Sequence, residues 1–158
     1  MVALKRPWRY RMAQRHRNFL PMSSLSPQEI VQKMMDLDAF SQWLGVRVLS
    51  VSAGECSIEM TVREEMVNGF RVAHGGITYS LADSALAFAS NSRGQHALSI
   101  ETAVSHTSPV SPGDHLVATA RELQCGQRLA RYEVTVQRNQ KTVALFKGTV
   151  FKNDTPWT

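Results

Sequence analysis

Two glycines and an aspartate interrupt a segment whose other residues predict a single helix. Residues 68–92 read NGFRVAHGGITYSLADSALAFASNS, and the apolar spacing predicts a helix over residues 75–91. Glycine and a mid-helix aspartate both disfavour helix. Gly75 and Gly76 would leave backbone N–H groups unshielded at the helix start, where the helix dipole reinforces them. Such a start can stabilise a developing oxyanion, although a glycine pair by itself more often serves only a tight turn.

Asp83 lies about two turns into this helix, too far along to cap it. The side chains one turn away are mostly apolar or small: Tyr79, Ser80, Leu86 and Ala87. A carboxylate with few partners is costly to bury in such surroundings, and its pKa rises. Carboxylates of this kind serve as general bases or nucleophiles, so Asp83 is a candidate catalytic group.

Gly75 and Asp83 cannot act on the same atom within one helix. Eight residues separate them, which is roughly 12 Å along a helix. A general base must come within about 3 Å of the group on which it acts, or reach it through one water. If both residues are catalytic, Asp83 of one chain must face Gly75 of a second chain across a two-fold axis. Small helix residues would permit that approach: Ser80, Ala82, Ser84, Ala87 and Ala89.

The sequence before this segment predicts a second helix. Ser26 suits the N-cap, Pro27 suits the first helical position, and Glu29 completes a capping box. We expect this helix to end near residues 36–38 and a short helical turn to follow before Gly45, which breaks the pattern.

Alternating apolar residues predict six strands, at 46–51, 56–63, 97–105, 115–123, 130–138 and 142–152. Residues 64–74 are expected to form an irregular loop. Consecutive strands joined by short turns imply antiparallel pairing. One face of such a sheet must be covered, and the helix 75–91 carries an apolar stripe that can cover it: Ile77, Leu81, Ala85 and Phe88. The predicted fold class is therefore α+β, with an extra N-terminal helix.

The charge of the chain is concentrated in its first 21 residues, which hold six of the 18 basic side chains and none of the 13 acidic ones. We interpret residues 22–158 as one domain and residues 1–21 as a flexible extension. The extension could also result from an upstream start codon, with Met22 as the working start. A targeting peptide, or an arm that binds nucleic acid or an anionic membrane, remains an alternative. Trp8, Tyr10 and Phe19 keep these alternatives open, but no nucleic-acid-binding motif supports them.

The cysteines and histidines form no recognisable metal or redox motif. Cys56 and Cys125 have no CxxC spacing, and the sequence shows no secretory apolar segment, so we predict a cytoplasmic protein. The five histidines form no HExxH-like pair, and we therefore expect no metal site. No apolar run approaches the roughly 20 residues of a membrane-spanning helix, so no membrane partner is expected.

The segment 68–92 resembles the signature of hot-dog-fold acyl-CoA thioesterases, and most of all the phenylacetic-acid-degradation thioesterase subfamily. Three further stretches also resemble that group: DAFSQWLGV (38–46), SPVSPGDHL (108–116) and KTVALFKG (141–148). The resemblance covers about residues 26–152 and implies a hot-dog fold, in which the sheet wraps around the long central helix. It also implies hydrolysis of acyl-CoA with an aryl or medium acyl group, and a homodimer that is usually part of a dimer of dimers.

Residue by residue, the resemblance implies that Asp83 is the catalytic base or nucleophile and that the Gly75 amide polarises the thioester carbonyl. Asn68 matches an asparagine that helps to orient the water or the substrate, and Ser99 matches a polar helper. His74 could contact the substrate or fix the loop, and we favour the second role. Without the resemblance, Asn68 is more often a turn residue and Ser99 a satisfied strand hydroxyl.

The acyl pocket is expected between loop 64–74, Tyr79 and the strand near Ser99. Val72, Ala73 and Gly76 are further candidate substrate contacts, and CoA enters only as part of the substrate, so no separate cofactor is expected. Four arginines are available for the phosphates of CoA: Arg93, Arg121, Arg128 and Arg131. Of these we select Arg93 and Arg128.

Two other functions are compatible with this architecture, namely an acyl-CoA dehydratase and a non-catalytic ligand sensor. A dehydratase would want an Asp/His pair, and Asp83 has no histidine at helical spacing. A sensor would carry a DNA-binding domain, for which 21 residues are too few.

Overall fold

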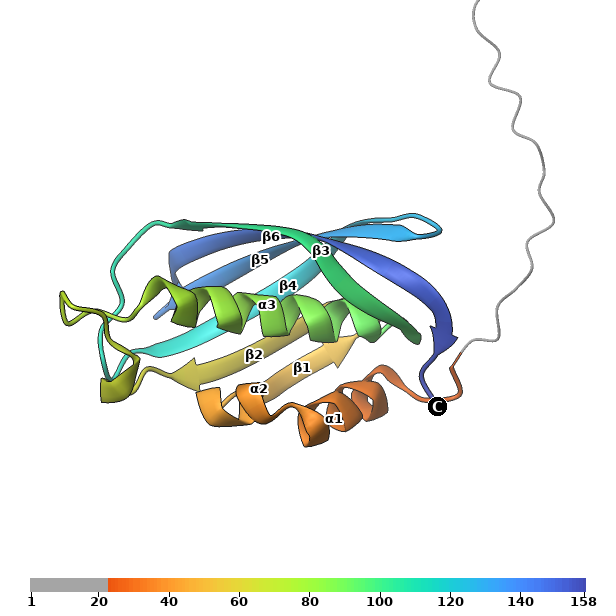
Figure 1. The fold of residues 1–158 in the computed structure, drawn as a ribbon, viewed down its shortest axis with the longest axis horizontal. Helices are drawn as coiled ribbons and strands as arrows, with labels where there is room; N and C mark the ends of the chain where they lie inside the picture. The colour runs from red at the N-terminus through yellow and green to blue at the C-terminus, as the bar shows by residue number, and fades with distance from the viewer. Residues whose placement is uncertain (1–22) are drawn as a thin grey trace, which may run out of the picture.

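A six-stranded antiparallel sheet curves around the long helix α3 (Gly75–Asn91) in the computed structural model (Figure 1). The structure describes residues 23–158, so the expectations for segment 1–21 fall outside the described residues. The other elements are α1 (Pro27–Leu37), α2 (Ala39–Leu44), β1 (Arg47–Ser52), β2 (Glu55–Thr61), the 3-10 helix η1 (Glu64–Met66), β3 (Gln95–His106), β4 (His115–Cys125), β5 (Leu129–Arg138) and β6 (Lys141–Pro156). This arrangement confirms the predicted α+β fold and its extra N-terminal helix.

The strands lie in the order β1-β2-β4-β5-β6-β3, and every neighbouring pair is antiparallel. The prediction that consecutive strands pair is correct for β1 with β2, β4 with β5 and β5 with β6. It is wrong for β3 and β4, because α3 carries the chain to the far edge of the sheet. Segment 107–114 then returns past the end where α3 begins (Figure 1), which leaves β3 as an edge strand beside β6.

The helix starts and stops follow the predicted local signals. The Ser26 hydroxyl accepts a hydrogen bond from the Glu29 amide at 3.3 Å, and the Glu29 carboxylate accepts one from the Ser26 amide at 2.7 Å, which completes the capping box. Gly45 ends α2 in the left-handed conformation at φ 77°. The loop 64–74 is less irregular than predicted, because η1 occupies its first three residues.

Strands β3 and β6 are longer than predicted, because they pair with each other from one end to the other. The pairing begins at Gln95 with Pro156 and ends at His106 with Ala144, so β6 continues past the polar residues that follow Lys152. A two-residue turn at Asn139 and Gln140, both with positive φ, joins β5 to β6.

The core lies between α3 and the concave face of the sheet. All four residues of the predicted helix stripe are buried: Ile77, Leu81, Ala85 and Phe88. The helix comes so close to β6 that a Cβ on Gly148 would lie 2.5 Å from Cδ2 of Leu86. At this position the absence of a side chain lets Leu86 pack closely against β6.

The two ends of the described chain meet beside the C-terminal end of α3. The Ser23 hydroxyl donates a hydrogen bond to the Trp157 carbonyl at 2.6 Å, and the Trp157 amide donates to the Gly94 carbonyl at 3.0 Å. The Trp157 indole N–H also donates to the Asn91 side chain at 2.9 Å. No helix within residues 23–158 is long and apolar enough to cross a membrane.

Candidate active site

The first turn of α3 exposes one backbone donor. His74 is the N-cap residue, and its Nδ1 accepts a hydrogen bond from the Gly76 amide at 2.9 Å. The His74 amide donates to the Met66 carbonyl at 2.8 Å, which ties the helix start to η1. Among residues 23–158, no group accepts a hydrogen bond from the Gly75 amide. With no acidic side chain in this turn, the positive end of the helix dipole is left uncompensated within α3.

Asn68 shapes the loop that leads into this helix. Its side-chain oxygen accepts a hydrogen bond from the Phe70 amide at 2.8 Å, and its backbone pairs with Val72. A single bridge between Val67 and Ala73 holds the two arms of the loop together. The loop is therefore a small, closed turn that presents Val72 and Ala73 next to the start of α3.

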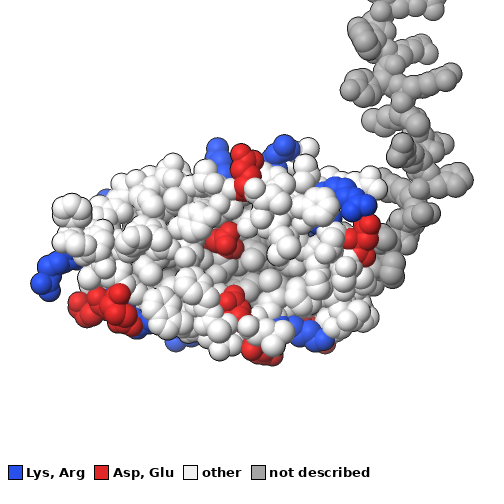
Figure 2. Space-filling model, viewed as in Figure 1, with Lys and Arg blue, Asp and Glu red and all other residues white. Residues whose placement is uncertain are grey.

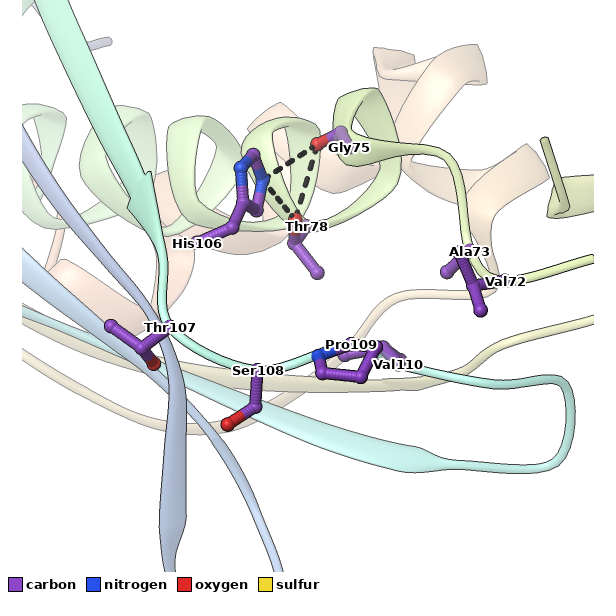
Figure 3. A pocket seen from close by; sticks show the side chains of 9 residues that line it. All are labelled: Val72, Ala73, Gly75, Thr78, His106, Thr107, Ser108, Pro109 and Val110. Carbon is purple, nitrogen blue, oxygen red and sulfur yellow. Dashed lines mark hydrogen bonds between the residues drawn. The ribbon is translucent and has the colours of Figure 1, made fainter. Parts of the chain in front are cut away.

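His106, at the end of β3, lies against the first turn of α3 (Figure 3). Its Nε2 is 2.8 Å from the Thr78 hydroxyl, which itself donates to the Gly75 carbonyl at 3.1 Å. The same Nε2 is 3.2 Å from the Gly75 carbonyl, so His106, Thr78 and Gly75 form one hydrogen-bonded group. A Cβ on Gly75 would lie 3.1 Å from the ring, so any other residue there would crowd His106. The sequence predicted neither His106 nor Thr78 as a site residue.

A cavity of about 330 Å³ opens where the loop, α3 and segment 107–110 meet (Figure 3). It is lined by Val72, Ala73, Gly75, Thr78, His106, Thr107, Ser108, Pro109 and Val110. Three of the lining residues, Gly75, Val72 and Ala73, were predicted from the sequence to contact the substrate or its carbonyl. Tyr79 and Ser99 were predicted near the same pocket but do not line this cavity. The wall formed by residues 107–110 exists because β3 and β4 do not form a hairpin.

Asp83 is half-buried on α3, about two turns beyond Gly75. No group within residues 23–158 donates a hydrogen bond to its carboxylate, and burial raises the pKa of Asp83 above its ordinary value of 3.8. The single chain does not bring Asp83 to Gly75, because both lie on one straight helix at the separation deduced from the sequence.

Asp83 belongs to a stripe of α3 that the chain itself leaves partly uncovered. Gly76, Ser80 and Ala87 share this half-exposed stripe, which consists mostly of small residues. The face of the molecule that shows α3 is largely uncharged, with isolated acidic groups near its middle (Figure 2). Beside α3, the edge strand β3 exposes large apolar side chains, with Leu98 at 74% and Ile100 at 60% exposure.

Tyr79 and Ser99 lie away from the cavity. The Tyr79 hydroxyl is hydrogen-bonded to the Thr102 hydroxyl on β3, and its ring packs edge-on against Phe146 at 5.4 Å. Ser99 is exposed on β3, next to a local shift in the pairing of β3 with β6.

Arg93 and Arg128 are both engaged in ion pairs. Two nitrogens of Arg93 donate to the Glu122 carboxylate at 2.8 and 3.0 Å, and Arg128 pairs with Asp154 at 3.0 Å. Arg93 follows the last turn of α3, so the 17 residues of that helix, roughly 25 Å, separate it from Gly75. Within one chain, neither arginine reaches the cavity.

Across residues 23–158, no three His, Cys, Asp or Glu side chains are grouped so that they could hold a metal ion. The chemistry available at the cavity is therefore that of a backbone donor, a hydroxyl and an imidazole, with a carboxylate further along the helix.

A long helix wrapped by a curved antiparallel sheet is the architecture of the hot-dog fold, which is found in thioesterases. The family comparison agrees, since residues 70–145 match the thioesterase superfamily. The chain belongs to this superfamily.

Individual relatives support the same membership. Over 116 residues, the chain is 39% identical to acyl-coenzyme A thioesterase PaaI of Escherichia coli K12, covering 73% of this chain and 83% of the relative. It is 32% identical over 108 residues to human acyl-coenzyme A thioesterase 13, covering 66% and 77%. The structure of the E. coli PaaI protein superposes with a TM-score of 0.81 at 34% identity, covering 84% of this chain and 96% of that one.

Proposed function

We propose that this protein hydrolyses acyl-CoA thioesters to the free acid and CoA. Two relatives are acyl-CoA thioesterases. Each is at least 32% identical to this chain, and each alignment covers most of the relative's length. The observation that carries the proposal is the free Gly75 amide at the start of α3, with the half-buried Asp83 carboxylate on the same helix.

In the reaction, the thioester carbonyl oxygen lies at the first turn of α3 and accepts a hydrogen bond from the Gly75 amide. The helix dipole and this amide stabilise the negative charge that develops when water attacks the carbonyl carbon. His74 keeps the turn in place by capping the Gly76 amide, so the donor is positioned before the substrate binds.

Asp83 takes the proton from the attacking water, with Asn68 helping to orient the water or the substrate. The raised pKa of Asp83, which burial causes, makes its carboxylate a stronger base. The alternative, in which Asp83 attacks the carbonyl carbon as a nucleophile, uses the same two groups.

Because Asp83 and Gly75 are about 12 Å apart along one helix, the reacting pair must come from two chains of a homodimer. Two features of the described chain support such a dimer. The stripe that contains Asp83 consists mostly of small residues, and the neighbouring edge strand β3 leaves its backbone and its apolar side chains uncovered. Two such dimers would make the tetramer expected from the sequence.

For the acyl group we propose an aryl or medium-chain acid. The similar PaaI protein comes from the phenylacetic acid degradation operon of E. coli, and the cavity beside Gly75 has apolar walls at Val72, Pro109 and Val110. In a dimer, Arg93 and Arg128 would bind the phosphates of CoA at the outer end of the site. A cytoplasmic location stays a prediction.

The decisive experiment replaces Asp83 by Asn in the full chain and measures release of CoA from a panel of aryl- and alkyl-CoA substrates. We expect kcat to fall by about 10²–10⁴-fold, the usual contribution of a general base. Since the base must be ionised, wild-type kcat/KM should fall as the pH drops through the raised pKa of Asp83. The variant should lack this acid limb.

A matched control, Asp36→Asn, changes an exposed carboxylate on α1 and should leave hydrolysis unchanged. Near-normal turnover by Asp83→Asn would refute the role of Asp83, and a wild-type protein that releases no CoA from any member of the panel would refute the proposed activity.

A further inference from the structure

A second cluster of reactive side chains lies near the end of the sheet where α3 finishes, away from the cavity. Cys125 is the last residue of β4, and Lys152 lies on β6, with β5 running between these strands. The Lys152 ammonium nitrogen is 3.0 Å from the Cys125 sulfur. The register explains this contact, because Cys125 pairs with Ala130, Ala130 pairs with Val150, and Lys152 lies two residues further along β6.

Lys152 is an unusual lysine, because it is only 7% exposed. A buried ammonium normally needs a carboxylate partner, since burial of an unpaired charge is costly. Within residues 23–158, no carboxylate lies within ion-pairing distance of Lys152. The nearby Glu122 is instead held by Arg93 and by the Tyr132 hydroxyl, at 2.8 Å each. Of the side chains that the structure describes, the thiol of Cys125 is the one hydrogen-bonded to this buried ammonium.

The two cysteines of the described chain are in opposite environments. Cys125 is exposed, so a small oxidant can reach its sulfur. Cys56 is fully buried in the core, and burial raises the pKa of its thiol to about 12. Peroxide reacts with the thiolate form of cysteine, which apolar surroundings disfavour. Cys56 is therefore an internal control for the reactivity of Cys125.

We propose that Cys125 and Lys152 form a peroxide-sensitive pair that closes into a covalent sulfur–nitrogen cross-link. The Cys125 thiolate attacks one oxygen of hydrogen peroxide, the O–O bond breaks, and the leaving hydroxide takes a proton from the Lys152 ammonium. This step yields water, a sulfenic acid on Cys125 and a neutral amine on Lys152. The amine nitrogen then attacks the sulfur, the S–O bond breaks, and a second water leaves.

The cross-link changes the molecule in two ways. It ties β4 to β6 across the intervening β5, at the end of the sheet opposite the cavity. It also converts a buried ammonium into an uncharged nitrogen. Because the sulfur is oxidised by only two electrons, excess thiol reverses the reaction and restores Cys125 and Lys152.

The test treats the reduced full-length protein with a few molar equivalents of hydrogen peroxide and measures the intact mass. The loss of two hydrogens lowers the mass by about 2 Da, whereas a sulfenic acid that stops there raises it by about 16 Da. After digestion with trypsin, we expect one peptide pair joined through Cys125 and Lys152, no cleavage after Lys152, and full reversal by dithiothreitol.

Two variants separate the steps. Lys152→Arg keeps a positive charge but has no primary amine, so it should stop at the sulfenic acid, which dimedone traps on Cys125. The exposed Lys147→Arg on the same strand is the matched control and should cross-link like the wild type. Dimedone labelling of wild-type Cys125 without any cross-link, equal oxidation of Cys56, or a disulfide between two chains would each overturn the proposal.

Discussion

At the scale of single residues, Gly75 has two reasons to be glycine. Its amide is the free donor at the start of α3, and its missing side chain makes room for the His106 ring. His106 in turn contacts both the Thr78 hydroxyl and the Gly75 carbonyl. These contacts from β3 hold the first turn of α3, so in the proposed mechanism His106 is a positioning residue for the Gly75 amide.

The His106→Ala variant tests this positioning role. Loss of one hydrogen bond is worth about 1 kcal/mol, so we expect kcat to fall about fivefold, with a smaller change in KM. His106→Gln retains an amide donor and should recover most of the loss. Steady-state kinetics on one good substrate would measure both parameters, and an increase in KM at constant kcat would show that His106 binds substrate instead.

Gly75 and Asp83 could be singled out as candidates from the sequence, because two glycines and an acid break the expected pattern of one helix. The place of His106 beside Gly75 could not be predicted, because 31 residues separate the two and only the position of β3 brings them together. Whether Asp83, Asn68 and Ser99 perform the roles that the resemblance implies stays a prediction. The contacts show that Asn68 at least closes a turn.

At the scale of elements, the packing of α3 against β6 depends on Gly148. A side chain at Gly148 would collide with Leu86, which lies on the buried face of α3. A shift of α3 away from the sheet would move the Gly75 amide with it, so this core contact also affects the geometry of the site.

The Gly148→Ala variant should therefore lower the free energy of unfolding. Overpacking of a well-filled core costs about 1–3 kcal/mol, which chemical denaturation would measure as a lower midpoint. Gly69→Ala adds the same methyl group where nothing lies within 4 Å, and should leave the midpoint nearly unchanged. Equal stability of both variants would mean that α3 can move without cost.

The elements themselves follow local signals, such as the capping box at Ser26 and the alternation along β5, and these were predictable. The order of the strands was not, because hydrophobic alternation is the same for a central strand and for an edge strand. The return of segment 107–114 to the middle of the sheet, which builds one wall of the cavity, could only be seen in three dimensions.

At the scale of the whole molecule, the sheet formed by residues 23–158 ends in two edge strands, β1 and β3. Strand β3 is twelve residues long and lies beside the stripe that contains Asp83. A long exposed edge with apolar side chains is a template for pairing with another chain. Pairing of two chains through β3 would make the proposed site complete.

Lysines on this edge should separate the chains. We expect the Leu98→Lys/Ile100→Lys double variant to be monomeric by sedimentation and to lose nearly all hydrolysis, because lysine on an edge strand opposes pairing. Leu49→Lys places one lysine on β1, where the side chain is 50% exposed, and should keep both the assembly and the activity. A fully active monomer would refute the shared site.

The meeting of Ser23 and Trp157 at the far end of α3 has a practical consequence. A solid support or a reporter coupled through Thr158 would be held roughly 25 Å, the length of α3, from the mouth of the cavity. The cavity beside Gly75 would thus face bulk solution in the immobilised protein.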